Sequence, residues 1–224
     1  MTDVAHNLQG LRQELDGSGV TLVAVSKYHP VEMIRQAYDA GQRIFGESHV
    51  QELGEKQKVL PQDIEWHFIG HLQTNKVKYI VPYITMIEAV DSLKLLKEID
   101  KQAAKCGRTI AVLLELHIAE EETKYGLTPD ALWQLLAEGS WRQLQHVRIC
   151  GLMMMASNVD DMEQIRSEFR QGRELFYQVK EQYFADVDYF RERSWGMSHD
   201  YKIAIEEGST IVRIGTTIFG PRVY

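Results

Sequence analysis

Short apolar runs alternate along this chain with longer segments in which apolar residues recur at helical spacing. The runs predict strands at 21–27, 43–47, 64–70, 84–89, 109–117, 147–155, 193–197 and 210–214. The periodic, charge-rich segments predict helices, most clearly at 30–40, 92–105, 128–138 and 160–182. The run 109–114 shows no alternation of polar and apolar residues, which is typical of a strand buried on both faces of a parallel sheet.

The order of these elements predicts a barrel. Eight strands that alternate with helices are the pattern of a (β/α)8 TIM barrel, so we expect residues 1–224 to form a single domain of this class. A further helix is predicted from Asp3 to about Asp16, ahead of the first strand, and we expect it to cover the gap that a helix after the eighth strand would fill. A doubly wound open sheet is disfavoured because no Gly-x-Gly-x-x-Gly motif follows the first strand.

Composition narrows the class of protein. A net charge of −7 and a pI near 5.6 argue against nucleic acid or an anionic membrane as the main partner. Cys106 and Cys150 lie far apart without metal-type spacing, which favours free thiols in a reducing compartment. No signal-peptide pattern and no run of membrane-spanning length is evident, so we expect a cytoplasmic protein.

Two late strands lead into residues suited to binding a phosphate group. Ser198 follows the seventh predicted strand, and Gly215 and Thr216 follow the eighth. Short hydroxyl groups and backbone N–H groups are therefore expected close together, without a bulky side chain that would exclude a phosphate group. In a barrel these loops commonly form a phosphate site. The alternatives are an ordinary tight turn at Gly215-Thr216 and, for Ser198, the N-cap of a helix over 199–206.

A lysine closes the first predicted strand. Strands 1 and 8 are neighbours in a barrel, so Lys27 is expected beside the phosphate-binding residues. A desolvated lysine has a lowered pKa and forms imines readily. A Schiff-base lysine beside a phosphate site predicts pyridoxal 5′-phosphate as the cofactor; the alternative is a surface lysine just beyond a strand.

An arginine in an apolar strand requires an acceptor. Arg213 lies in the run Ile211-Val212-Arg213-Ile214, where its partner is either a pyridine nitrogen or a buried carboxylate, for which Glu47 and Glu115 are the candidates. An arginine donating to the ring nitrogen keeps that nitrogen unprotonated and makes the ring a weak electron sink.

A histidine-containing segment follows the third predicted strand. His67, His71, Gln73 and Asn75 are expected near the carboxyl-terminal rim, around an organic cofactor rather than a metal, because no carboxylate or cysteine stands at ligand spacing. Met153 and Met155 end the sixth strand and are predicted to pack in the core, with one of them available to line the cofactor ring.

Taken together, these residues closely resemble the pyridoxal phosphate homeostasis protein family, which is related to the N-terminal domain of alanine racemase. The resemblance covers nearly the whole chain. Its motifs are Ala24-Val25-Ser26-Lys27, Phe45-Gly46-Glu47, Val50-Gln51-Glu52, Trp66 to Gln73 with Asn75-Lys76, Lys124 with Gly126, Gly151-Leu152-Met153, Gly196-Met197-Ser198 and Gly208 to Gly220.

The resemblance implies a role for each matched position. Lys27 is then the lysine that holds the cofactor as an internal aldimine, and Arg213 is the partner of the pyridine nitrogen. Ser198, Gly215 and Thr216 are the phosphate ligands, with Met197 beside them.

The chain departs from the family pattern in two places. Ser48-His49 replaces the usual asparagine and aromatic residue after Phe-Gly-Glu, and Glu115-Leu116-His117 replaces a small polar run.

The sequence is compatible with three functions. The expected one is a non-catalytic protein that binds pyridoxal phosphate for intracellular vitamin B6 homeostasis, as a monomer or weak dimer, with cofactor-dependent apoenzymes as partners. The alternative is a single-domain amino-acid racemase, but racemisation needs acid–base groups on both faces of the ring, and the tyrosine-bearing second domain of related racemases has no counterpart in this sequence. A third hypothesis is a cofactor-free barrel enzyme that acts on a phosphorylated substrate.

Overall fold

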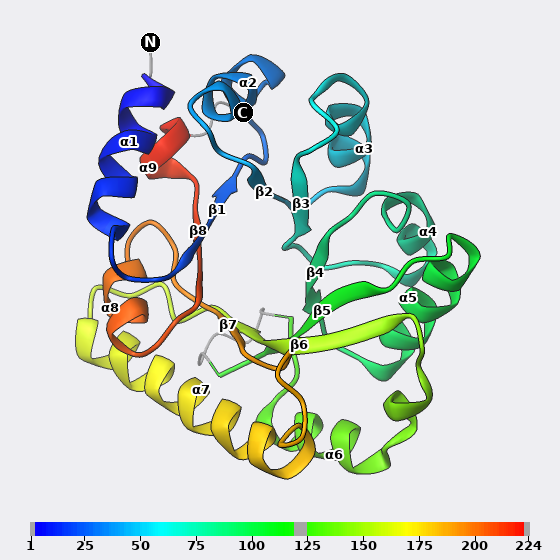
Figure 1. Cartoon of the computed structure of the whole chain (residues 1–224). Helices are drawn as coiled ribbons and strands as arrows, with labels where there is room; N and C mark the ends of the chain where they lie inside the picture. Colours follow the sequence, from blue (N-terminus) through cyan, green and yellow to red (C-terminus); the bar gives the residue numbers. More distant parts are fainter. Residues whose placement is uncertain (1–2, 119–124, 222–224) are drawn as a thin grey trace.

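The computed structural model describes residues 3–118 and 125–221, and its centre is a closed parallel barrel (Figure 1). Each strand pairs with the next along the chain, and β8 pairs with β1 from Thr21 opposite Ile211 to Ala24 opposite Ile214. The strands are β1 Thr21–Val25, β2 Ile44–Glu47, β3 Glu65–Phe68, β4 Met86–Val90, β5 Ile110–Leu116, β6 Val147–Met154, β7 Glu192–Ser194 and β8 Ile211–Ile214. The predicted TIM barrel is confirmed.

The strands are apolar on both faces because each face is covered. Inside the barrel, a small cluster that includes Val23, Leu113, Met153 and Ile211 fills the lumen. Outside it, a larger continuous core packs the other strand faces against the helices. This double burial explains the lack of alternation in β5, in which all residues but Ala111 are buried.

Helices surround the barrel as the sequence pattern predicts (Figure 1). The described helices are α1 Val4–Leu15, α2 Val31–Asp39, α3 Val50–Val59, α4 Val77–Ile80, α5 Leu93–Lys105, α6 Pro129–Glu138, α7 Met162–Tyr183, α8 Tyr201–Glu206 and α9 Thr216–Phe219, with 3-10 turns at Thr74–Lys76 and Ser140–Gln143. Side chains at the starts of four described helices accept backbone hydrogen bonds: Asp3, Ser92, Thr128 and Asp161.

The first helix occupies the place predicted for it. Helix α1 packs against the short α9, which follows β8, and Asn7 Nδ2 donates to the carbonyl of Ile218 at 3.1 Å (Figure 1). Four residues of α9 are too few to cover the last strand alone, so α1 completes the outer layer.

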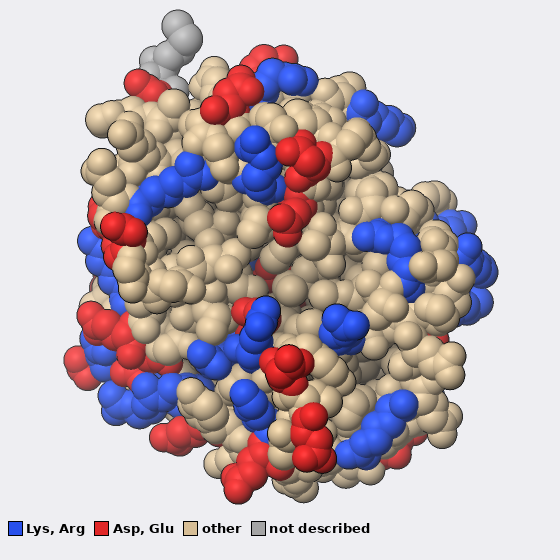
Figure 2. All heavy atoms as spheres, viewed as in Figure 1, with Lys and Arg blue, Asp and Glu red and all other residues tan. Residues whose placement is uncertain are grey.

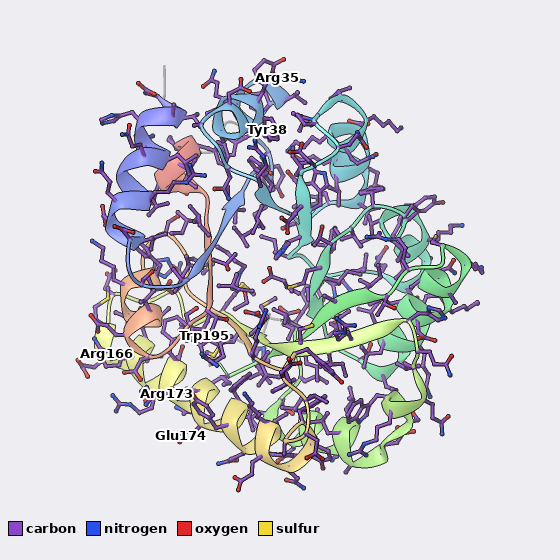
Figure 3. All side chains as sticks on the ribbon, viewed as in Figure 1. Arg35, Tyr38, Arg166, Arg173, Glu174 and Trp195 are labelled. Atoms are coloured by element: carbon purple, nitrogen blue, oxygen red, sulfur yellow. The ribbon has the colours of Figure 1, made fainter. Side chains whose placement is uncertain are left out.

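Several element ends differ from the sequence prediction. Strand β1 ends at Val25, so Lys27 lies in the following turn, and β7 ends at Ser194 rather than at residue 197. The next residue, Trp195, is fully buried (Figure 3), and Gly196 has a φ of +95° that turns the chain out of the sheet. A Cβ at Gly196 would lie 2.6 Å from Ala204 Cβ, so only glycine fits this approach to α8.

The surface carries charges of both signs. Figure 2 shows basic and acidic side chains interspersed across the described part of the face seen in Figure 1. Along α7, Arg166 and Arg173 (Figure 3) pair with α8 and the residue after it: Arg166 with Glu206 at 2.6 Å and Arg173 with Glu207 at 2.9 Å. These pairs join the two helices that flank β7.

Candidate functional site

The cofactor-binding residues predicted from the sequence all line one cavity. It has a volume of about 270 Å³ and lies beyond the carboxyl ends of the strands, where TIM-barrel sites form. Its lining comprises Val25, Lys27, His29, Ile69, Met155, Asn158, Met197, Ser198, His199, Arg213, Gly215 and Thr216. Residues nearly 190 positions apart in the sequence are brought together because β1 and β8 are neighbours.

Lys27 reaches the cavity from the turn after β1. It is partly buried, and a backbone hydrogen bond of 3.1 Å from His29 N to Ser26 O closes the turn around it. The expected closeness of Lys27 to the loops after β7 and β8 is therefore observed, although the lysine stands two residues beyond the strand rather than within it.

Short donors gather at one end of the cavity. Ser198 Oγ accepts a hydrogen bond from Gly215 N at 3.3 Å, which ties the loop after β7 to the residue after β8. A Cβ on Gly215 would lie 3.1 Å from the carbonyl oxygen of Val25, so this glycine lets β8 pass close to the end of β1. Thr216 is exposed at the cavity wall and leaves its hydroxyl accessible to a ligand.

The helix-cap alternative for Ser198 is wrong. Helix α8 begins at Tyr201 with Asp200 in the N-cap position, two residues beyond Ser198. The Asp200 carboxylate instead accepts a hydrogen bond from Met197 N at 2.5 Å and so holds the loop that carries Ser198. Burial raises the pKa of Asp200, and this backbone hydrogen bond and the neighbouring His199 oppose that rise.

Arg213 lies at the opposite end, buried in the barrel lumen. Its Nη1 donates to Ser194 O and Ser194 Oγ, both at 2.6 Å, and its Nη2 donates to Met154 O at 2.9 Å. Its carboxylate partner is Glu88, with 3.8 Å between Nη1 and Oε2. Burial lowers the pKa of Arg213, and Glu88 opposes this effect.

Neither carboxylate predicted to pair with Arg213 does so. Glu47 is bound to Lys56 on the outer side of β2, at 2.8 Å. Glu115 lies in the lumen, but its Oε2 has no hydrogen-bond partner among the described residues. The prediction failed because the sequence does not show which residues of each strand point into the lumen, and this must be known before residues of different strands can be paired. The available signal for Glu88 was an acidic residue within the apolar run of β4.

Glu88 connects Arg213 to a histidine across the lumen. Its Oε1 lies 2.6 Å from His67 Nδ1, and its Oε2 accepts from Ser194 Oγ at 2.5 Å. Burial alone would raise the pKa of Glu88, but the hydrogen bond and charge of His67, together with Arg213 and Ser194, hold it below the usual value. The four groups form one polar layer beneath the cavity.

Glu115 has a different environment from Glu88. Burial, together with the nearby charge of Asp91, raises its pKa to about 7, while Arg213 opposes the rise. A carboxyl group with this pKa changes its charge near neutral pH.

The rim prediction for the histidine-containing segment is partly wrong. His67 is buried in β3, where it pairs with Glu88. His71, Gln73 and Asn75 line a separate cavity of about 400 Å³, in which His71 Nδ1 lies 3.2 Å from Asp91. Of the two methionines, Met155 lines the cavity that holds Lys27, whereas Met153 is buried in the lumen. Among residues 3–118 and 125–221, no three potential ligands are grouped to hold a metal ion.

Three polar residues of the cavity were not predicted. Asn158 follows β6, His199 follows Ser198, and His29 stacks on Phe219 with 5.0 Å between the ring centroids. No motif marks them, since they enter the cavity through loop geometry. Lys124, part of the resemblance, lies outside the described residues.

Comparisons with known proteins agree with this geometry. The family described as "Alanine racemase, N-terminal domain" matches residues 1–223. The pyridoxal phosphate homeostasis protein of Aquifex aeolicus is 42% identical over 91% of this chain and 87% of its own length, and that of Mus musculus is 40% identical over 91% and 77%. The chain belongs to the pyridoxal phosphate homeostasis protein family. The resemblance inferred from the sequence is thereby confirmed.

Solved structures place this family member among related barrels. PipY of Synechococcus elongatus, in its structure with PLP bound, is 38% identical, covers 97% of this chain and all of its own, and superposes with a TM-score of 0.86. An alanine racemase of Clostridium difficile superposes with a TM-score of 0.76 at 14% identity, over 98% of this chain and 56% of the racemase, which shows a common fold. None of the described helices has the length and apolar character needed to cross a bilayer.

Proposed function

We propose that this chain binds pyridoxal 5′-phosphate as a Schiff base with Lys27 and serves intracellular vitamin B6 homeostasis without turning over amino acids. The observation that carries the proposal is that one cavity has a lysine at its side, an arginine at one end and short hydrogen-bond donors at the other. The family membership of the chain and the PLP-bound relative agree with it.

The residues present fit this cofactor. The cavity volume of about 270 Å³ is near the lower limit for small-molecule sites and suits one substituted ring. Ser198, Gly215 and Thr216 supply the phosphate end with hydroxyls and a close backbone, and Arg213 supplies a fixed donor for the ring nitrogen. When bound, the cofactor supplies an aldehyde that condenses with amines.

Lys27→Ala tests the covalent assignment, with Lys76→Ala as a matched control. We expect protein incubated with pyridoxal phosphate to show an imine absorbance band that Lys27→Ala abolishes and Lys76→Ala retains. Borohydride reduction followed by peptide mass mapping should locate the adduct on Lys27. An adduct on Lys76 or Lys124 instead would contradict the assignment, and a protein that forms no imine would favour a cofactor-free enzyme.

The charge of Arg213 supports a role without turnover. Guanidinium groups stay protonated in proteins, so Arg213 donates to a ring nitrogen and does not protonate it. The ring is then a weak electron sink and α-proton removal is disfavoured. Lys27 remains able to exchange its bond for one to another amine, which allows the cofactor to be passed to an apoenzyme.

Solvent deuterium exchange at the α-carbon of L-alanine distinguishes a carrier from a racemase. With the cofactor fully loaded, we expect no appreciable exchange and no D-alanine. Rapid exchange with formation of the D-isomer would make the protein a single-domain racemase. Exchange of the Lys27 imine with added amine, followed by absorbance, serves as the positive control for a competent site.

The cytoplasm is the compartment we propose for this activity. Cys106 is exposed, Cys150 is buried, and both are free thiols, as is usual where the surroundings are reducing.

A further inference from the structure

The residue after Lys27 has a strained backbone. Tyr28 has a φ of +66° and is the one non-glycine residue of the described ranges in the left-handed region. A bulky side chain in that region costs free energy, so the conformation persists only where surrounding contacts impose it, and such positions cluster at functional sites. The strain at Tyr28 therefore calls for a contact that maintains it.

Two side chains of α3 hold the backbone on both sides of Lys27. Tyr28 N donates to Glu52 Oε1 at 2.7 Å, and Lys56 Nζ donates to Ser26 O at 2.8 Å. Glu52 and Lys56 are four residues apart on the helix and bind each other at 2.6 Å. The turn from Ser26 to Tyr28 is thus fastened to α3 at the residue before and the residue after the lysine.

The buried carboxylate of Glu47 links these contacts to the barrel. Lys56 Nζ also binds Glu47 Oε1 at 2.8 Å, and Ser26 Oγ donates to the same oxygen at 2.6 Å. Glu47 and Ser26 are fully buried and Lys56 nearly so. Because Glu47 ends β2, the contacts tie the Lys27 turn both to α3 and to the neighbouring strand.

Glu52 is the partly exposed member of this group of contacts. Its Oε2 lies 3.6 Å from His49 Nδ1, and His49 Nε2 lies 3.4 Å from the Tyr28 hydroxyl. His49 belongs to Ser48-His49, one of the two places at which the sequence departs from the family pattern, so here the departure contributes an outer contact to the same turn. The Glu52 side chain is 24% exposed, which makes its substitution less disruptive than that of buried Lys56.

We infer that Glu52 and Lys56 are positioning residues that fix the Lys27 turn so that its amine is aligned for imine formation. This inference rests on the proposed function. In the reaction the neutral amine of Lys27 adds to the aldehyde carbon, the C=N bond forms, and the two amine protons leave with the aldehyde oxygen as water. The pair transfers no proton; it holds the nucleophile in place, and a misplacement of about 1 Å costs up to about a hundredfold in rate.

Two ligands separate positioning from general stability. Pyridoxal phosphate forms the imine, whereas pyridoxine 5′-phosphate carries an alcohol in place of the aldehyde and binds through its ring and phosphate only. For Glu52→Ala we expect imine formation to slow about ten- to a hundredfold, with the dissociation constant of pyridoxine 5′-phosphate unchanged within about twofold. Glu52→Gln keeps an acceptor for Tyr28 N and should recover most of the rate.

Glu55→Ala is the matched control, because it removes an exposed carboxylate from the same helix, and among the described residues no hydrogen bond or ion pair joins Glu55 to the Lys27 turn. We expect wild-type behaviour with both ligands. If Glu52→Ala does not fold, Glu52→Asp, which keeps the charge but reaches less far, should show a smaller loss of imine rate with unchanged binding of the alcohol.

Equal losses with both ligands, or no loss with either, would overturn the positioning role. Failure of the proposed function has a different signature, since the wild-type protein itself would then form no imine on Lys27.

Discussion

The two ends of the cavity that Lys27 lines are built in opposite ways. At the end that we propose binds the phosphate, Ser198, Gly215 and Thr216 offer neutral hydroxyls and backbone groups from loops close to solvent. At the other end, Arg213 and Glu88 are charged groups buried in the barrel lumen, where each depends on the other and on Ser194. One end is made by loop geometry and the other by compensated charges.

This difference predicts different consequences of mutation. A neutral donor near solvent is replaced by water when it is removed, so its loss affects ligand affinity and little else. A buried charge whose partner is removed keeps its desolvation penalty, so removing the partner lowers the stability of the whole barrel. The ends are therefore separable by experiment.

Glu88→Gln should produce the largest effect on stability. It leaves Arg213 buried with no carboxylate within 4.0 Å among the described residues, and it weakens the contact with His67. Breaking a buried ion pair from one side costs about 3–5 kcal/mol. We expect a loss of this size in the free energy of unfolding measured in urea. A loss below about 1 kcal/mol would mean that Ser194 and the Met154 carbonyl satisfy Arg213 without Glu88.

Glu115, which also lies in the barrel lumen, tests the buried end through the pH dependence of stability. Burial raises its pKa in the folded protein from 4.5 to about 7, so between these values the folded state binds more protons than the unfolded state. Stability must then fall as the pH rises through this window, by about 3 kcal/mol in total. Glu115→Gln should remove that dependence, so that the variant gains on the wild type from pH 5 to pH 8 in urea unfolding. Parallel pH profiles would show that Glu115 titrates normally.

Ser198→Ala and Thr216→Val should give the smallest stability effects and a clear loss of affinity. Each removes one hydroxyl from the proposed phosphate site, which keeps other donors, so we expect a loss of about 1–3 kcal/mol of binding. Thr217→Val is the matched control, because Thr217 is also exposed but does not line the cavity. Calorimetry with pyridoxal phosphate and with pyridoxal provides the measurement, and equal affinity for the two ligands would argue against a phosphate site here.

The sequence predicted the parts of the site that depend on strand order. Lys27 and Thr216 are neighbours because strands 1 and 8 must meet in any closed barrel, so counting strands was sufficient. The partner of Arg213 was not predicted because it depends on which face of β4 points inward, and the pairing of β4 with β5 shifts register between Ile87 and Val90.

The ends of elements were predicted less well for a related reason. Trp195 is apolar enough to extend a strand, and it is buried as a strand residue would be, but the positive φ of Gly196 redirects the chain at that point. No role was predicted for Lys56 from the sequence. Its burial beside Glu47 arises only when α3 docks on β2.

The pairing of β1 with β8 has a consequence for how the protein acquires its ligand. Closing a loop of nearly 190 residues is entropically costly and comes late in folding, because contacts distant in sequence form after local ones. Lys27 precedes Gly215 and Thr216 by nearly 190 residues, so it is synthesised well before them. A chain whose barrel is still open therefore already carries the lysine but not the cavity, which comes into existence only when β8 closes on β1.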